Sequence, residues 1–76
     1  MVDILSHIES TPDVMLGKPL IKGTRITVEL ILQKMADGYS TSELLEMYPH
    51  LKHEDLLAAI AYAASVIANE EVIKAA

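Results

Sequence analysis

The spacing of apolar side chains changes near residue 27. From residue 28 onward, leucine, isoleucine, valine and methionine recur every three or four positions, which predicts amphipathic helices. Earlier, apolar residues stand in short runs broken by proline and by turn-forming residues, which favours short strands and loops. We therefore predict one domain, with short strands in residues 1–26, three helices in residues 27–69 and a tail in residues 70–76.

The first predicted helix covers residues 28–37. Thr27 is a good N-cap residue, because its hydroxyl can accept a hydrogen bond from a free amide of the first turn. Gly38 follows the helix and can adopt the left-handed conformation in which many helices end. The side chains expected on the buried face are Val28, Ile31, Leu32 and Met35.

A short second helix is predicted over residues 41–47. Ser40, with Glu43 three residues later, forms a capping-box pattern at its start. Pro49 disfavours a helical conformation at Tyr48, so the helix should end there. The apolar side chains expected to hold this helix and the turn after it are Leu44, Leu45, Met47 and Leu51.

The third predicted helix covers residues 53–69 and is apolar on two sides. The stripe expected to face the core consists of Leu56, Ile60, Ala63 and Ile67. The opposite side carries Asp55, Ala59, Tyr62 and Val66. Because that side holds less charge than a solvent-facing side normally would, we predict that it binds a protein partner, either a second copy or a different chain.

Helix, glycine turn, short helix, turn and longer helix is the order of a helix-turn-helix unit. The predicted fold class is therefore mainly α: a small helix-turn-helix-like (winged-helix-like) three-helix domain with short N-terminal β-strands. Within those strands we expect the region around Ile8 to pair with the region around Leu20 or Arg25.

The segment GKPLIKGTRITV, residues 17–28, is positively charged in a chain whose formal net charge is −5. Its cations Lys18, Lys22 and Arg25 could contact phosphate groups, which the acidic helical part would repel. For Arg25 we favour a structural role, in which the guanidinium ties the loop to a carboxylate or to helix-end carbonyls. The residues expected to fix the backbone of this segment and of the helix ends are Gly17, Pro19, Gly23, Thr24, Arg25, Gly38, Tyr48 and Pro49.

The order GKPLIKGTRITVELIL, then ADGYSTSELLEMYP, then HLKHEDLLAAIAYA, resembles the bacterial and archaeal domain-of-unknown-function family four-three-three. The resemblance covers about residues 8–66. Two departures are Leu16, where many relatives have glycine, and Lys22, where many have arginine. Members are usually described as predicted antitoxins, so the resemblance implies a protein that neutralises a co-expressed toxin.

The sequence offers no support for catalysis, a metal or a cofactor. Gly17-Lys18 lacks the upstream glycine and the following hydroxyl residue of a phosphate-binding loop. His50 and His53 lack the further ligands that a zinc site needs, and there is no cysteine. Glu43 and Glu46 fit the solvated face of a short helix better than a catalytic pair. We therefore predict a protein that is not an enzyme.

Size and apolar content favour an assembly. The chain has 76 residues, of which 51% are hydrophobic, and it has no disulfide to staple a small core. We expect a homodimer or a larger homo-oligomer. We also expect a cytoplasmic location without membrane contact, because residues 1–10 carry no basic leader and no apolar run approaches membrane-spanning length.

Two functions remain open. The first is an antitoxin-like module that binds and neutralises a nuclease-type toxin, since acidic helices would suit a basic, nucleic-acid-handling partner. The second is a DNA-binding transcriptional regulator that acts as an oligomer, or with its toxin, through Lys18, Lys22 and Arg25. The charge pattern favours the first, because neither candidate recognition helix presents a cation that could read base edges.

Overall fold

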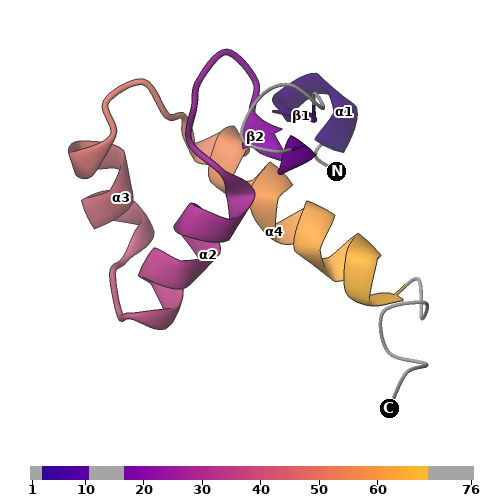
Figure 1. Ribbon diagram of the computed structural model, residues 1–76. Coiled ribbons are helices and arrows are strands. Elements are labelled where there is room, and N and C mark those ends of the chain that lie inside the picture. The colour runs from indigo at the N-terminus through magenta and orange to yellow at the C-terminus, as the bar shows by residue number, and fades with distance from the viewer. Residues whose placement is uncertain (1–2, 11–16, 69–76) are drawn as a thin grey trace.

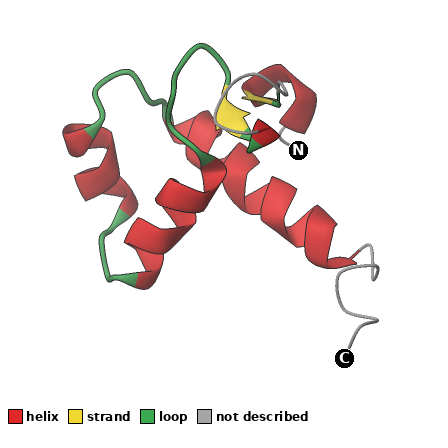
Figure 2. Ribbon diagram, viewed as in Figure 1, coloured by secondary structure: helices red, strands yellow, loops and turns green. Residues whose placement is uncertain are grey.

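The computed structural model describes residues 3–10 and 17–68. Its elements, in chain order, are α1 (Ile4–His7), β1 (Ile8–Glu9), β2 (Leu20–Ile21), α2 (Val28–Ala36), α3 (Thr41–Met47) and α4 (His53–Ala68) (Figure 1). The protein is mainly helical, with a short two-stranded antiparallel sheet near its N-terminus, as the sequence predicted (Figure 2). In the part of the chain that is described, none of these helices is both long and apolar enough to cross a membrane.

The small sheet joins the two N-terminal segments in the predicted place. Ile8 lies opposite Ile21, and Glu9 lies opposite Leu20. A further antiparallel bridge joins Leu20 to Thr27, so the chain doubles back on itself just before α2. The helix α1 was not predicted, because a single helical turn is too short to show a helical period. Ile4 in this turn packs against the core.

The caps of α2 and α3 confirm the predictions. The Thr27 hydroxyl accepts a hydrogen bond from the Leu30 amide at 2.9 Å, and Gly38 follows α2 with a φ of 104°. At α3, the Glu43 amide donates to the Ser40 hydroxyl at 3.1 Å, and the Ser40 amide donates to the Glu43 carboxylate at 2.7 Å. Both helix starts therefore satisfy amides that would otherwise lack partners.

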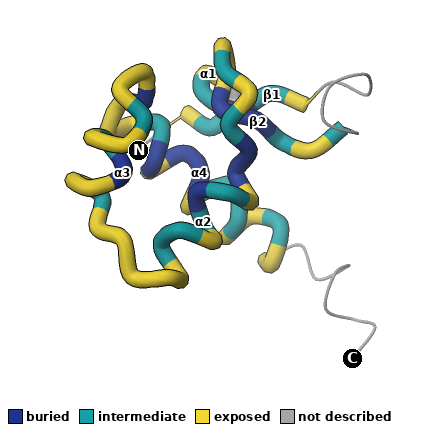
Figure 3. The backbone as a smooth tube through the Cα atoms, turned by 60° about the vertical axis from the view of Figure 1, so that its left-hand side comes forward, coloured by how far each residue is buried: buried dark blue, intermediate teal, exposed yellow. Residues whose placement is uncertain are grey.

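The core gathers around side chains from β2, α2, α3 and α4. Those with essentially no exposed surface are Ile21, Ile31, Leu44 and Leu56. Leu51 is also buried and anchors the turn before α4, as predicted. Met47 was expected on the apolar side of α3 that faces the core, but its side chain is exposed. Figure 3 shows the buried backbone in dark blue around β2 and the start of α2.

The predicted orientation of α4 is wrong. Of the stripe expected to face the core, Leu56 is buried, but Ile60 is 40% exposed and Ile67 is 58% exposed. Ala59, which was expected to face outward, is fully buried. Tyr62, from the same predicted outer side, packs against the core.

The reason is that α4 carries apolar residues on nearly every side, so hydrophobic spacing alone does not select the inner one. The positions of small side chains decide which side of α4 faces the core. Ala58 and Ala59 have no exposed surface, and α4 packs there against α1, β1, α2 and α3. Alanine lets neighbouring backbones approach closely, and larger side chains such as Leu57 and Ile60 are left on the outside.

Candidate functional site

Two concave surfaces lie at opposite ends of α4. The first, which we call the basic cleft, has a volume of about 670 Å³ and is lined chiefly by His7, Lys22, Arg25, His50, Lys52 and Asp55. The second, which we call the apolar groove, has a volume of about 450 Å³ and is lined chiefly by Val28, Leu32, Tyr62, Ala63, Val66 and Ile67. Both volumes fall within the range of about 300–1,000 Å³ that is common for binding sites.

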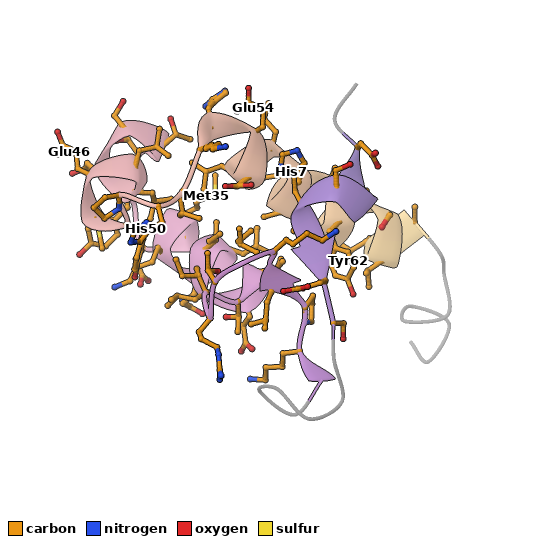
Figure 4. All side chains as sticks on the ribbon, turned by 90° about the horizontal axis from the view of Figure 1, so that it is seen from above. His7, Met35, Glu46, His50, Glu54 and Tyr62 are labelled. Atoms are coloured by element: carbon orange, nitrogen blue, oxygen red, sulfur yellow. The ribbon has the colours of Figure 1, made fainter. Side chains whose placement is uncertain are left out.

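The basic cleft is assembled from segments that lie far apart in sequence. His7 ends α1, and Lys22 and Arg25 belong to the turn after β2. His50, which is labelled in Figure 4, comes from the loop between α3 and α4. Lys52 belongs to the same loop. Three of the six lysine and arginine residues of an acidic chain therefore line one cleft.

Backbone and hydroxyl hydrogen bonds hold the turn that carries Lys22 and Arg25. The Lys22 amide donates to the His7 carbonyl at 2.7 Å, and the Ile21 amide donates to the Ile26 carbonyl at 2.8 Å. The Thr24 hydroxyl donates to the Ile21 carbonyl at 2.8 Å and accepts from the Ile26 amide at 2.9 Å. These backbone and hydroxyl bonds fix the turn without using the guanidinium of Arg25.

Gly23 permits this turn. Its φ of 84° lies in the left-handed region that other residues rarely adopt, and its amide donates to the Glu9 carboxylate at 3.3 Å. Gly23 and Thr24, which were predicted to fix the backbone of this segment, thus both take part in the turn.

Asp55 is the acidic member of the cleft, and it is engaged within the protein. One carboxylate oxygen lies 2.8 Å from His7 Nδ1, and the other accepts a hydrogen bond from the Lys52 amide at 2.9 Å. The Asp55 side chain is only 13% exposed. Its predicted place on an outward partner-binding side is wrong, because it joins α4 to α1 and helps to close the start of α4.

The motif cations separate into two groups. Lys18 pairs with Glu29 at 2.8 Å on the exposed surface and lies outside the cleft lining. Arg25 is exposed, and among the described residues its guanidinium makes neither an ion pair nor a side-chain hydrogen bond. The favoured prediction, that Arg25 ties the loop to a carboxylate or to helix-end carbonyls, is therefore wrong for this part of the chain.

Sequence reasoning missed Lys52, His50 and His7 as members of the cleft. Lys52 stands 27 or more positions beyond Lys22 and Arg25, in a segment whose surroundings are acidic. The available signal was indirect: Leu51 was expected to be anchored in the core, which fixes its neighbour Lys52 near the start of α4.

The apolar groove lies between α2 and α4. The two helices pack together and then diverge, as Figure 1 shows, and the groove follows the diverging part. Its lining is almost wholly apolar, with Glu29 and Gln33 as the polar members. Tyr62 and Val66 were predicted to bind a partner, and both line this groove, whereas buried Ala59 cannot be reached from it.

Comparison with known proteins identifies the family. Residues 8–63 match the family described as "Protein of unknown function (DUF433)". The chain belongs to this family. The motif resemblance is thereby confirmed, while the antitoxin role that it implies stays a prediction.

Two relatives to which the chain is similar are longer than the stretch that it matches. The chain is 36% identical over 56 residues to "Uncharacterized protein y4eO" of Sinorhizobium fredii (strain NBRC 101917 / NGR234). The matched stretch covers 74% of this chain and 25% of that protein. A crystal structure of a DUF433 member from Anabaena variabilis ATCC 29413 is 40% identical, with a TM-score of 0.75, over 76% of this chain and 57% of that one. The chain therefore spans about a quarter of the first relative and just over half of the second.

Proposed function

We propose that this DUF433 chain is an antitoxin-like protein-binding module, whose apolar groove holds an apolar segment of a basic, nuclease-type toxin. The observation that carries the proposal is the groove itself. Its lining is almost wholly apolar, and Ile67 at its edge is 58% exposed. An exposed apolar surface of this kind on a small domain is typical of a protein-binding site.

The shape of the groove suits a helix or an extended segment of a partner. Grooves between two helices commonly take an amphipathic helix whose apolar side chains enter at one or two positions per turn. Val28 and Leu32 on α2 face Tyr62 and Val66 on α4 across the groove, so both walls offer apolar contact.

The charge of the chain favours a basic partner over an acidic one. Residues 27–76 carry a net charge of −5. Complementary charge at the rim raises the association rate and excludes partners of like charge. Proteins that handle nucleic acid carry basic surfaces, which is why a nuclease-type toxin fits both the charge and the family resemblance.

The test is binding of the purified product of the neighbouring reading frame, measured by calorimetry and by rescue of cell growth on co-expression. The informative variant is Ile67→Lys, which places a cation in the groove. Leu57→Lys is the matched control, because Leu57 is 44% exposed on the same helix, does not line the groove, and lies about 15 Å away along the axis. Loss of binding in the first variant alone supports the proposal. Failure of the unaltered chain to bind or to rescue growth rejects it.

A second copy of the chain is the competing occupant of the groove. Sedimentation of the chain alone at several concentrations separates the two cases. If a homodimer forms and Ile67→Lys dissociates it, the groove is a self-association surface, and the toxin proposal loses its site.

The second candidate function is DNA binding by an oligomer. The presence of Lys22, Arg25 and Lys52 in one cleft favours it. The exposed side chains of α3 oppose base readout, because they include Glu43 and Glu46 and no cation. Any contact with nucleic acid by this chain would therefore use phosphate groups rather than bases.

A further inference from the structure

We propose that the basic cleft is a binding site for a terminal phosphate group, such as that of a nucleoside monophosphate. This site is separate from the apolar groove and does not depend on the partner-binding role proposed above.

The first argument is charge. The cleft brings together the side chains of Lys22, Arg25 and Lys52, while the chain as a whole carries a net charge of −5. The carboxylate within the cleft, that of Asp55, is held by His7 and by the Lys52 amide. Three cations that line one cleft raise the local positive potential, and a concave surface focuses that potential on an approaching anion.

The second argument is the state of Arg25. Its guanidinium makes no ion pair or side-chain hydrogen bond with the described residues, although its own turn is held rigidly by the Thr24 hydroxyl and by backbone hydrogen bonds. A guanidinium fork binds two oxygens of one phosphate at once. The bonds of the turn therefore hold the backbone from which this fork extends, and the hydrogen-bonding capacity of the fork is open to a ligand.

The third argument concerns which phosphate is preferred. A terminal phosphate carries nearly two negative charges near neutral pH, whereas a phosphate inside a nucleic-acid chain carries one. The cations that line the cleft match the more highly charged group. The concave shape, of about 670 Å³, also admits the end of a molecule with its attached sugar and base more readily than an unbroken backbone.

Two histidines border the site. His7 and His50 line the cleft from α1 and from the loop before α4. His7 is oriented by its 2.8 Å contact with the Asp55 carboxylate.

The experiment uses nuclear magnetic resonance of the full 76-residue chain with four probes. They are adenosine 5′-monophosphate, adenosine, and one single-stranded oligonucleotide with and without a 5′-phosphate. We expect the monophosphate and the phosphorylated oligonucleotide to shift the amide signals of residues 22–26, and the two probes without a terminal phosphate to leave them unchanged. A shift by the phosphorylated oligonucleotide alone would identify a nucleic-acid end as the source of the phosphate.

Substitutions locate the site. Arg25→Gln should weaken binding at least about tenfold, since hydrogen bonds between charged partners are strong, and should leave folding unchanged because Arg25 is exposed. Arg25→Lys keeps the positive charge but loses the guanidinium fork. Its affinity for the phosphate probe should therefore lie between that of the unaltered chain and that of Arg25→Gln. Lys18→Gln is the matched control, because it removes a motif cation that lies outside the cleft lining.

Three results would overturn the proposal. They are no shift with any probe at millimolar concentration, equal binding with and without the terminal phosphate, or equal weakening by Arg25→Gln and Lys18→Gln. Ile67→Lys should leave phosphate binding intact, so a failure here is distinct from a failure of the partner-binding proposal.

Discussion

The two ends of α4 show how one helix can support two unlike surfaces. Around its first turn, a loop, a tight turn and the end of α1 converge, and hydrogen bonds fix polar and charged side chains in the basic cleft. Toward its last turns, α4 diverges from α2 and leaves apolar side chains uncovered in the apolar groove. In this protein the polar surface is held by backbone anchoring, whereas the apolar surface requires only that two helices separate.

The two surfaces share one support, which is the buried middle of the protein. Leu56 has no exposed surface and lies between the residues that enter the cleft and those that enter the groove. The largest expected effect therefore comes from removing it. Leu56→Ala should lower the free energy of unfolding by about 3 kcal/mol, because a cavity is left in the core. Urea denaturation is the measurement.

The same variant tests whether the surfaces depend on one fold. Leu56→Ala should reduce phosphate binding and partner binding together. Leu57→Ala is the control, because Leu57 is 44% exposed and its removal should change stability by about 0.5 kcal/mol or less. Retention of either binding activity in an unfolded Leu56 variant would contradict the shared support.

The next effect separates the two surfaces. Ile67→Lys should weaken the toxin complex by about 2 kcal/mol, because it places a charged side chain against an apolar partner segment, and should leave phosphate binding unaltered. Arg25→Gln should show the reverse pattern. Calorimetry on both variants with both ligands measures these opposite effects. A variant that weakens the binding of both ligands equally would show that the two surfaces are coupled.

A smaller effect is expected at the turn that presents the cations. Gly23→Ala should lower the free energy of unfolding by about 1 kcal/mol, because the φ of 84° is unfavourable for a residue with a Cβ, although no atom lies within 4 Å of that Cβ. Gly38→Ala, with a φ of 104° and equal space, is the matched control. Both should cost stability, but only Gly23→Ala should also weaken phosphate binding. Equal phosphate binding in the two variants would show that the turn does not position the site.

The smallest effect concerns the acid within the basic cleft. Asp55→Asn should cost about 1 kcal/mol or less of folding stability, since it removes a charge-assisted contact with His7 but keeps an oxygen acceptor. It should also tighten phosphate binding, because a negative charge leaves the cleft. Titration of the variant with adenosine 5′-monophosphate measures whether the affinity rises or falls. Weaker binding would mean that Asp55 mainly positions His7 for the ligand.

Local structure could be predicted from neighbouring residues in the chain. The Thr27 cap, the Ser40 and Glu43 capping box, and the turn at Gly38 each depend on residues within a few positions of one another, so the predicted boundaries of α2 and α3 agree closely with the structure. The pairing of Ile8 with the region near Leu20 was also predictable, because few segments before α2 suit a strand.

The buried side of α4 and the set of cations that line one cleft depend on long-range packing. Ile60 and Ile67 are as apolar as Leu56, yet Ala58 and Ala59 face inward, because close packing against α1, β1 and α2 favours small side chains there. Lys52 joins Lys22 and Arg25 because the buried Leu51 fixes the start of α4 beside the turn after β2. Neither outcome follows from local spacing, since each depends on contacts between segments that are distant in the chain.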